Sequence, residues 1–344
     1  MLDIFVSTET EKKLRSVEKN KTMLIIGKDT NRHAVNVIKY YDSLPKVLHD
    51  YGDSELSKGF EDAKKFSAPH VFLLNVINEH DYIDLVTVLK QYDFAYIVPL
   101  NIYISDYFHD KNRNEQKIHY GRDYIERASA YNNSLFIMTD KHASLYEDMD
   151  HFLDEMKAHV RAIRSTITMG VKAKNFAFVA NNLRGYSMSN VVLASILTAS
   201  DYGDYPAMKR EQVIFDIDSF DIGDDEIIYF KQSELVGTTV ENLVNFEKNA
   251  PILKSIFVDR IINYILRTLD LSDVAGRNYS VYQKIRAEKM LELYFDELKG
   301  WLLRDYQIES IEFIKESVGA GVLECTITVW PKSTTEKYAL LIGG

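Results

Sequence analysis

The pattern of apolar and polar residues is clearest between residues 251 and 344, where a helical period gives way to a strand period. Residues 252–269 are apolar except for a narrow polar line at every fourth position, which predicts a helix packed on most of its circumference. A second helix is predicted from the capping box of Ser280 and Gln283 to Gly300. Alternating residues then predict strands at 308–314, 322–329 and 338–342, which completes an α+β unit.

Each end of the chain is predicted to be a short apolar strand joined to the body by a polar spacer. The spacers are residues 9–21 and 332–337. The strands contain six apolar residues: Leu2, Ile4, Val6, Leu340, Leu341 and Ile342. An unpaired sheet edge can accept a strand from another chain, and such terminal strands are suited to that association. Closure of the chain's own sheet is the alternative, and the pattern leaves both open.

Between residues 21 and about 200, apolar strands alternate with helices, which predicts a mostly parallel α/β sheet covered on both faces. The predicted strands are 22–28, 71–77, 92–99, 134–138 and 175–180, and the predicted helices are 35–48, 54–66, 81–91, 121–131, 147–165 and 189–199. Residues 201–250 combine dense turn signals with short strands. The expected order is an N-terminal strand and linker arm (1–20), an α/β domain (21–200), a β-rich connection (201–250), and a C-terminal α+β domain (251–344) with a terminal arm from about 332.

Composition and charge narrow the class of function. The 344 residues are 46% hydrophobic and 27% charged, as in globular proteins, and the net charge of −10 argues against a protein that neutralises nucleic-acid phosphates. No apolar run approaches the roughly eighteen residues of a membrane span, and the first residues do not resemble a signal peptide. The single cysteine, Cys325, lies within a predicted strand, and we expect an inert packed thiol.

Several stretches resemble parts of active or binding sites, but none is complete. Gly27-Lys28-Asp29 follows a strand without the spacing of a phosphate loop, and Gly319 and Gly321 precede a strand rather than the helix of a dinucleotide site. The nine histidines form no metal-ligand motif. One acidic run does not match a calcium loop and is expected to be solvated, with a metal or a basic partner as the alternative: Asp216, Asp218, Asp221, Asp224 and Asp225. We therefore predict no catalytic residue, cofactor or metal site.

Several short patterns nevertheless follow one another in the order seen in a known family. They comprise a strand ending in Gly-Lys (22–28), a serine-led helix followed by Tyr-Gly and Ser-x-Leu (42–56), a "YDF…IVP" strand (92–99), a small-residue helix with a following proline (195–206), a "V-x-R-x-x-N-Y-I" helix (258–265), a helix end with Gly-x-Leu (295–302), and a "V-W-P … Y-A-L-L-I" finish (329–342). In this order the chain resembles the sheath proteins of contractile tails, found in myophages and phage-tail-like bacteriocins. Its N-terminal region is shorter than is common in that family.

The resemblance implies a structural protein rather than an enzyme. In the family, terminal strands insert into the C-terminal domains of neighbouring subunits, these domains line the tail tube, and the α/β domain faces outward. The implied partners are other copies in a helical polymer, the tail tube protein, and the baseplate and tail terminator proteins, without nucleic acid or membrane insertion. The implied location is a virion tail or tail-like particle, assembled in the host bacterial cytoplasm. Contraction would drive the tube through a target cell envelope.

The resemblance also implies roles for individual residues. The six residues of the terminal strands would be exchanged between subunits and received by an edge within 308–314 or 322–329. Lys284, Arg286 and Lys289 on the second C-terminal helix are candidates for contact with the tube, and a solvated helix face is the alternative. Two other functions stay open, namely an α/β enzyme whose site is assembled from residues distant in sequence, and another tail component such as a ring-forming tail terminator.

Overall fold

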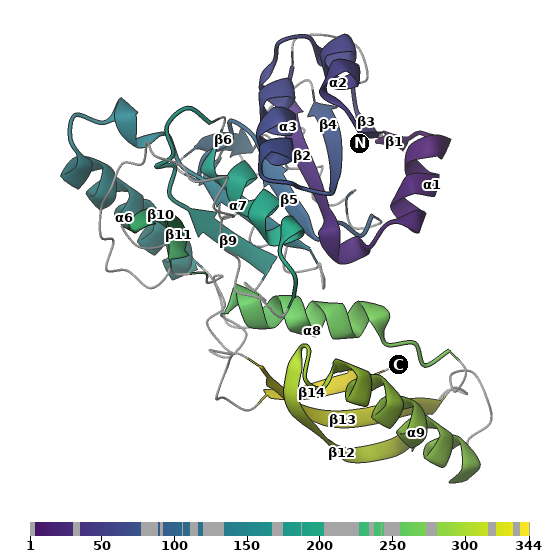
Figure 1. Ribbon diagram of the computed structural model, residues 1–344. Coiled ribbons are helices and arrows are strands. Elements are labelled where there is room, and N and C mark those ends of the chain that lie inside the picture. The colour runs from purple at the N-terminus through teal and green to yellow at the C-terminus, as the bar shows by residue number, and fades with distance from the viewer. Residues whose placement is uncertain are drawn as a thin grey trace. The chain divides into compact units, whose positions relative to one another are not determined.

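The computed structural model divides the chain into two compact units (Figure 1). The α/β unit comprises Met1–Ser200 and Pro206–Ile256, and the C-terminal unit comprises Asp201–Tyr205 and Phe257–Gly344. The structure describes residues 4–29, 35–76, 89, 92–104, 106–110, 116–119, 134–166, 175–186, 188–202, 227–233, 237–241, 243, 255–272, 281–315, 321–332 and 338–343. The α/β unit thus includes residues 1–20 and 206–250, while residues 201–205 belong to the C-terminal unit.

A seven-stranded sheet forms the centre of the α/β unit, in the order β1-β3-β4-β2-β5-β8-β9. Neighbouring strands are parallel except for the antiparallel pair β3 and β4, so the expected mostly parallel sheet is confirmed. The strands are β1 (Phe5–Val6), β2 (Thr22–Lys28), β3 (Val37–Tyr41), β4 (His70–Val76), β5 (Tyr96–Pro99), β8 (Leu135–Thr139) and β9 (Phe176–Val179).

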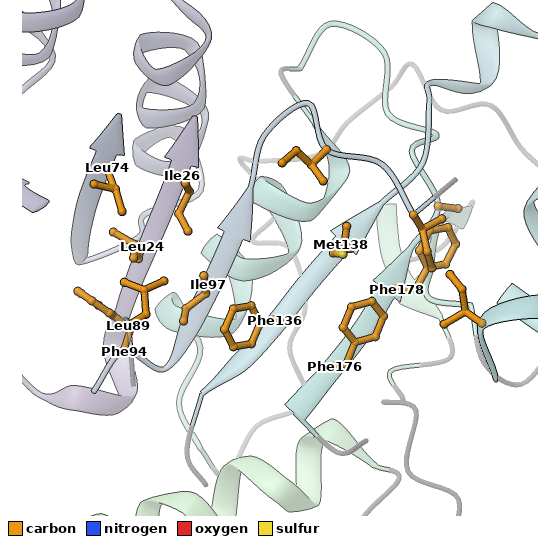
Figure 2. Packing of buried hydrophobic residues seen from close by; sticks show 14 of the residues in the cluster. Leu24, Ile26, Leu74, Leu89, Phe94, Ile97, Phe136, Met138, Phe176 and Phe178 are labelled. Carbon is orange, nitrogen blue, oxygen red and sulfur yellow. The ribbon is translucent and has the colours of Figure 1, made fainter. Parts of the chain in front are cut away.

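The central strands are apolar throughout because both faces of the sheet are covered. On one face, side chains such as Leu24, Phe136 and Phe178 form a continuous buried cluster (Figure 2) to which Phe152 of α6 (Met149–Thr166) belongs. The opposite face contacts α3 (Glu55–Lys65) and α7 (Ser189–Ala199). Burial of each large side chain contributes roughly 1.5–3 kcal/mol, so this double layer is the main source of the unit's stability.

The glycine of the Gly27-Lys28-Asp29 stretch has a packing role. A Cβ atom at Gly27 would lie 2.8 Å from the side chain of Leu56, so the missing side chain lets α3 approach β2 closely. The backbone N–H of Asp29 donates to Oδ1 of Asn75 at 2.8 Å, which fixes the chain as it leaves the strand. These contacts account for the stretch as a strand end packed against a helix.

The first fifty residues differ from the sequence prediction in two places. The charged stretch expected to be a spacer forms α1 (Thr8–Ser16), because Ser7 caps the helix by accepting from Thr10 N–H and Leu14 finds a buried position. The expected helix at 35–48 is instead β3 followed by α2 (Leu44–Tyr51). The Val, Ile and Tyr residues of β3 favour a strand, and the proline in the first turn of α2 marks where the helix begins.

Most of the other predicted helices and strands in the described part of the α/β unit are present. The expected helices at 54–66, 147–165 and 189–199 correspond to α3, α6 and α7, and the strands at 22–28, 71–77, 134–138 and 175–180 are present within one or two residues. A hairpin of β6 (Tyr107–Asp110) and β7 (Gln116–His119) was not predicted. The predicted helix at 121–131 and almost all of that at 81–91 lie outside the described residues, as do the acidic run and Ser280.

Residues 227–233 and 237–241 attach to the edge of the α/β sheet. Strands β10 (Tyr229–Ser233) and β11 (Gly237–Glu241) form an antiparallel hairpin. The backbone of Ile228 exchanges hydrogen bonds with Phe178 and Ala180 at 3.0 and 2.8 Å, next to β9. Buried Asn182 adds a bond from Nδ2 to the carbonyl of Phe230 at 2.8 Å. The β-rich character that we expected is present, but the hairpin extends the first unit.

The C-terminal unit contains the predicted helices and strands. Its helices are α8 (Ile256–Thr268) and α9 (Val281–Leu298), and its antiparallel sheet has the order β12 (Leu303–Lys315), β13 (Gly321–Pro331), β14 (Tyr338–Gly343). Helix α9 lies across one face of the sheet (Figure 1) and buries Leu291 and Phe295, with Phe295 stacked on Tyr306 at 5.2 Å between ring centroids. Gly300, at φ +86°, ends α9 and donates its N–H to the carbonyl of Leu303 at 2.8 Å.

Candidate functional site: the edges of the C-terminal sheet

Strand β13 is the central strand of the C-terminal sheet, and it has buried residues on both faces, with Thr328 1% exposed. Cys325, Ile327 and Val329 are each 0% exposed and lie on one face. Burial raises the pKa of the Cys325 thiol, as expected for an inert packed cysteine. On the β12 side, Cys325 pairs with Ile311 and Ile327 with Ile308, which continues the apolar layer.

The C-terminal strand β14 pairs with the other edge of β13 over six residues. Ile342 is opposite Cys325, Leu340 is opposite Ile327, and Leu341 is opposite Thr326. Directly opposed residues in an antiparallel ladder share a face of the sheet, so positions 340 and 342 are in register with one face of β13 and position 341 with the other. In this single chain, the strand closes its own sheet, which is one of the two possibilities left open by the sequence.

The N-terminal strand pairs within the α/β unit rather than with the C-terminal sheet. Phe5 and Val6 of β1 pair with Val37 and Ile38 of β3, and Phe5 N–H donates to the carbonyl of Asn36 at 2.9 Å. Ile4 and Val6 pack against the buried cluster of the α/β unit, while Phe5 is 63% exposed. Leu2 lies outside the described residues.

Both outer margins of the C-terminal sheet lack a strand partner in the described part of the chain. The three-stranded order ends with β12 on one side and β14 on the other. At β12, a bridge between Lys299 and Leu303 occupies only the first position of a strand of thirteen residues. A sheet margin without a strand partner can pair with an added strand through its backbone N–H and C=O groups.

Polar contacts fix the outer strand β12 to α9. The hydroxyl of Tyr306 donates to Oδ1 of Asp296 at 2.8 Å, and Lys299 Nζ lies 2.7 Å from Oδ1 of Asp305. Burial raises the pKa of Tyr306 to about 12, and the bond to Asp296 adds to the shift. The ammonium of Lys299 lowers the pKa of Asp305. These contacts with α9 and with the residue that follows it therefore fix the position of β12 and of its outer margin.

The sequence did not reveal the pairing of Asp140 with His159 in the α/β unit. Asp140 follows β8, and Nδ1 of His159 on α6 lies 3.1 Å from its Oδ2. The side chain of Asp140 is 1% exposed, and its hydrogen bond raises the pKa of His159. In open α/β sheets, ligands bind beyond the carboxyl ends of the strands, which is where this pair lies, and here it ties α6 to the end of β8.

Within the described residues, neither a metal site nor a membrane span can be recognised. No three His, Cys, Asp or Glu side chains of that part of the chain gather as potential metal ligands. No described helix has the length and apolar character needed to cross a bilayer.

Comparison with known proteins finds the same architecture in several solved structures. No protein-family model matches the sequence, and no curated protein matches it. Among solved structures, a sheath tail protein of Desulfitobacterium hafniense matches with a TM-score of 0.62 at 9% identity, covering 99% of this chain and 100% of that one. A sheath tail protein of Listeria innocua matches with a TM-score of 0.60 at 9% identity, covering 93% and 94%. The contracted sheath complex of an extracellular contractile injection system, PVC, matches with a TM-score of 0.57 at 11% identity, covering 99% and 90%.

The chain has the fold of contractile tail sheath proteins. This sheath fold includes both units, because the match covers 99% of the chain. The resemblance seen in the sequence is therefore confirmed at the level of the fold. At these identities, no side-chain role follows from the match.

Within the sheath fold, the three basic candidates on α9 do not share one face. At about 100° per residue, Arg286 and Lys289 lie roughly 60° apart, whereas Lys284 lies about 200° from Arg286. The buried residues of α9 begin at Ala287 and continue at Leu291. Lys284 is one turn before Ala287 and two turns before Leu291, so it projects from the side of the helix that faces the sheet. Lys284 and Lys289 are exposed, and Arg286 is half-buried.

The outward face of α9 also carries apolar residues that sequence reasoning missed. Val281, Tyr282 and Leu293 are 69–72% exposed, and Ile285 is 46% exposed. The signal was visible in the sequence, since this helix has apolar residues on both faces, but a continuous apolar pattern does not say which face is covered. Exposed apolar residues that gather on one element are typical of an interaction surface.

Proposed function

We propose that this protein is the subunit of a contractile tail sheath, which polymerises helically around a tail tube and shortens to drive the tube through a target cell envelope. The observation that carries the proposal is the sheath fold over 99% of the chain. The open margins of the C-terminal sheet support it, because they provide the backbone groups that a linked polymer requires.

In this proposal, the C-terminal strand is exchanged between copies. Strand β14 of one copy would pair with β13 of the next in the register seen within the single chain, with Leu340 opposite Ile327 and Ile342 opposite Cys325. The exchange replaces an internal ladder with an identical one between copies, so the backbone bonds and apolar contacts are regained rather than lost. Leu341 would lie on the other face of the ladder.

The N-terminal strand would be exchanged as well. Leu2, Ile4 and Val6 would add to the outer margin of β12 in a neighbouring copy, within the receiving edge expected at 308–314. Since this margin and the β13 edge lie on opposite sides of the hairpin, one C-terminal sheet could accept a strand from each of two neighbours. Each subunit would then be linked to several others.

Contraction would proceed by movement of nearly rigid bodies while the strand ladders persist. The α/β unit, which would face outward, contains a sheet buried on both faces, and such a core transmits force without deforming. Backbone ladders between copies resist separation, whereas contacts between the faces of domains can be exchanged. The free energy would come from a metastable extended array, so the proposed subunit is structural and uses no cofactor.

The tube-facing surface would lie on α9. We propose that Arg286 and Lys289, together with Tyr282 and Ile285 on the outward face, contact the tail tube protein. Lys284, on the side of α9 that faces the sheet, would lie outside that surface. Baseplate and tail terminator proteins would contact the ends of the polymer, in a virion tail or tail-like particle assembled in the bacterial cytoplasm.

Removal of residues 338–344 tests the proposal. We expect the truncated chain to remain a folded monomer by circular dichroism and to form no sheath in negative-stain electron microscopy, because the strand that links copies is absent. A matched pair refines the test: Leu340→Asp should block assembly, whereas Leu341→Asp, on the opposite face of the ladder, should assemble more readily.

The outcomes separate the alternatives. Tubes formed by the truncated chain would contradict strand exchange. Closed rings formed by the full chain would indicate a tail terminator instead of a sheath. A stable monomer at high concentration that binds a nucleotide or metal in calorimetry would indicate an enzyme with an α/β site.

A further inference from the structure

The N-terminal segment, residues 4–16, occupies a site in the α/β unit that is incompatible with its proposed role in assembly. Ile4 and Val6 pack on the buried cluster of their own chain, and β1 pairs with β3. The same backbone groups cannot pair at the same time with a neighbouring copy's sheet. The free chain and the assembled chain therefore require two different positions of this segment, an inference that rests on the proposed function.

The contacts that dock the segment are specific. Tyr40 N–H of β3 donates to Oγ1 of Thr10 at 3.2 Å, and the ammonium of Lys13 lies over the ring of Tyr40, 4.9 Å from its centroid. Leu14 is 5% exposed and belongs to the buried cluster. The segment is thus a folded part of the unit, with a defined docking surface on β3.

The docking is nevertheless slight. Strand β1 has two residues, and Thr10 and Leu14 are the buried side chains of the nine-residue α1. A cavity of about 870 Å³ opens between α1, β3 and α2, lined among others by Ser7, Lys12 and Lys46. An isolated helix of this length is marginal in water, so α1 depends on these few contacts.

The chain becomes firmly held directly after the segment. Thr22 is fully buried, its hydroxyl donates to the carbonyl of Lys19 at 2.6 Å, and Ala95 N–H donates to that hydroxyl at 3.0 Å. Between α1 and this anchor, Val17 and Glu18 have extended backbone angles. A change of the backbone angles at these two residues would release the segment without disturbing β2. The seventeen residues before Glu18, if fully extended, would span up to about 60 Å.

We propose that the N-terminal segment masks its own linking strand: it is docked on β3 in the free subunit and leaves that site when the subunit joins a second copy. Docking keeps Ile4 and Val6 from adding to another chain before a neighbour is correctly placed. The partner that displaces the segment is the C-terminal sheet of another copy. Docking therefore slows assembly.

A reversible covalent lock tests the proposal. Phe5 and Val37 are paired in the β1–β3 ladder on the partly exposed face, so Phe5→Cys/Val37→Cys should form a disulfide that holds the segment in place. Under oxidising conditions, we expect no polymer by light scattering and electron microscopy, and assembly on addition of reductant. The matched control Lys231→Cys/Thr239→Cys links partners in the β10–β11 hairpin and should assemble in both conditions.

A second pair of variants measures the effect of weaker docking. Leu14→Ala removes buried contacts of α1 and should shorten the lag before assembly several-fold. Lys12→Ala, at an exposed residue of the same helix, should leave the lag unchanged. An oxidised lock that polymerises as fast as its reduced form, or a longer lag for Leu14→Ala, would overturn the proposal. Absence of polymer for every variant and for the unmodified chain would overturn the proposed function itself.

Discussion

The seven-stranded sheet of the α/β unit and the three-stranded sheet of the C-terminal unit differ in how fully the rest of the chain covers and pairs their strands. In the α/β unit, β2, β4, β5, β8 and β9 are buried on both faces, and helices cover them. In the C-terminal unit, the three-stranded sheet leaves both margins without a strand partner in the described part of the chain. The comparison suggests that the first sheet is a finished core and that the second is built to be completed.

The two terminal strands also differ in how extensively they are paired. Strand β14 is paired over six residues, whereas β1 is paired over two residues beside a cavity. If both strands are exchanged, the C-terminal one contributes most of the strength of the link and the N-terminal one is the easier to release. By this comparison, the C-terminal strand determines the strength of the link between subunits, and the N-terminal strand determines when the link forms.

The largest effect that would sharpen the comparison concerns the core of the α/β unit. Phe136→Ala should lower the free energy of unfolding of that unit by about 3–5 kcal/mol, because its ring is fully buried at the centre of the sheet. Leu293→Ala, at a residue that is 69% exposed on α9, should change stability by less than about 0.5 kcal/mol. Denaturant titration of both variants measures these differences.

Tryptophan fluorescence and circular dichroism together can show which unit is destabilised by Phe136→Ala. Both tryptophans, Trp301 and Trp330, belong to the C-terminal unit, so their fluorescence reports its unfolding, while circular dichroism reports both units. We expect Phe136→Ala to shift the transition seen by circular dichroism more than that seen by fluorescence. Equal shifts in both signals would mean that the units unfold as one, and the contrast between a finished and an incomplete unit would not hold energetically.

A smaller effect depends on pH and concerns the α/β unit alone. The hydrogen bond to the carboxylate of Asp140 raises the pKa of His159, with Glu155 adding to the shift and Lys141 opposing it. The stabilisation is complete below the ordinary histidine pKa of about 6.5 and is lost as pH rises through the higher pKa of the folded state. We expect a loss of roughly 1 kcal/mol or less on alkalisation, which His159→Gln should abolish. An identical pH slope in both proteins would contradict this assignment.

Much of the fold could be predicted because its signals are local. Continuous apolar runs identify β2, β4, β8 and β9, and the change of period identifies the C-terminal unit. The failures have physical causes as well. Strand β3 has a mixed pattern because it is near the sheet edge, and the charged α1 is a helix because Ser7 caps it and Leu14 finds a buried position in the tertiary fold.

The candidate site was predictable only in part. The apolar alternation at 322–329 and the terminal run at 338–342 identify strands that pair, but the same register serves an internal ladder and an exchanged one. No sequence pattern distinguishes them, because the contacts are identical. The exposed apolar face of α9 and the pairing of His159 with Asp140 also depend on what lies opposite in the fold.

Cross-linking of the C-terminal ladder in assembled particles tests the central claim most directly. Cys325 is the only cysteine and is opposite Ile342, so Ile342→Cys places two thiols in one cross-strand pair, while Ala339→Cys, opposite Thr328, is the matched control. After oxidation and denaturing electrophoresis, strand exchange predicts a ladder of covalent multimers for Ile342→Cys and monomers for the control. A disulfide formed only within single chains of intact particles would contradict the account.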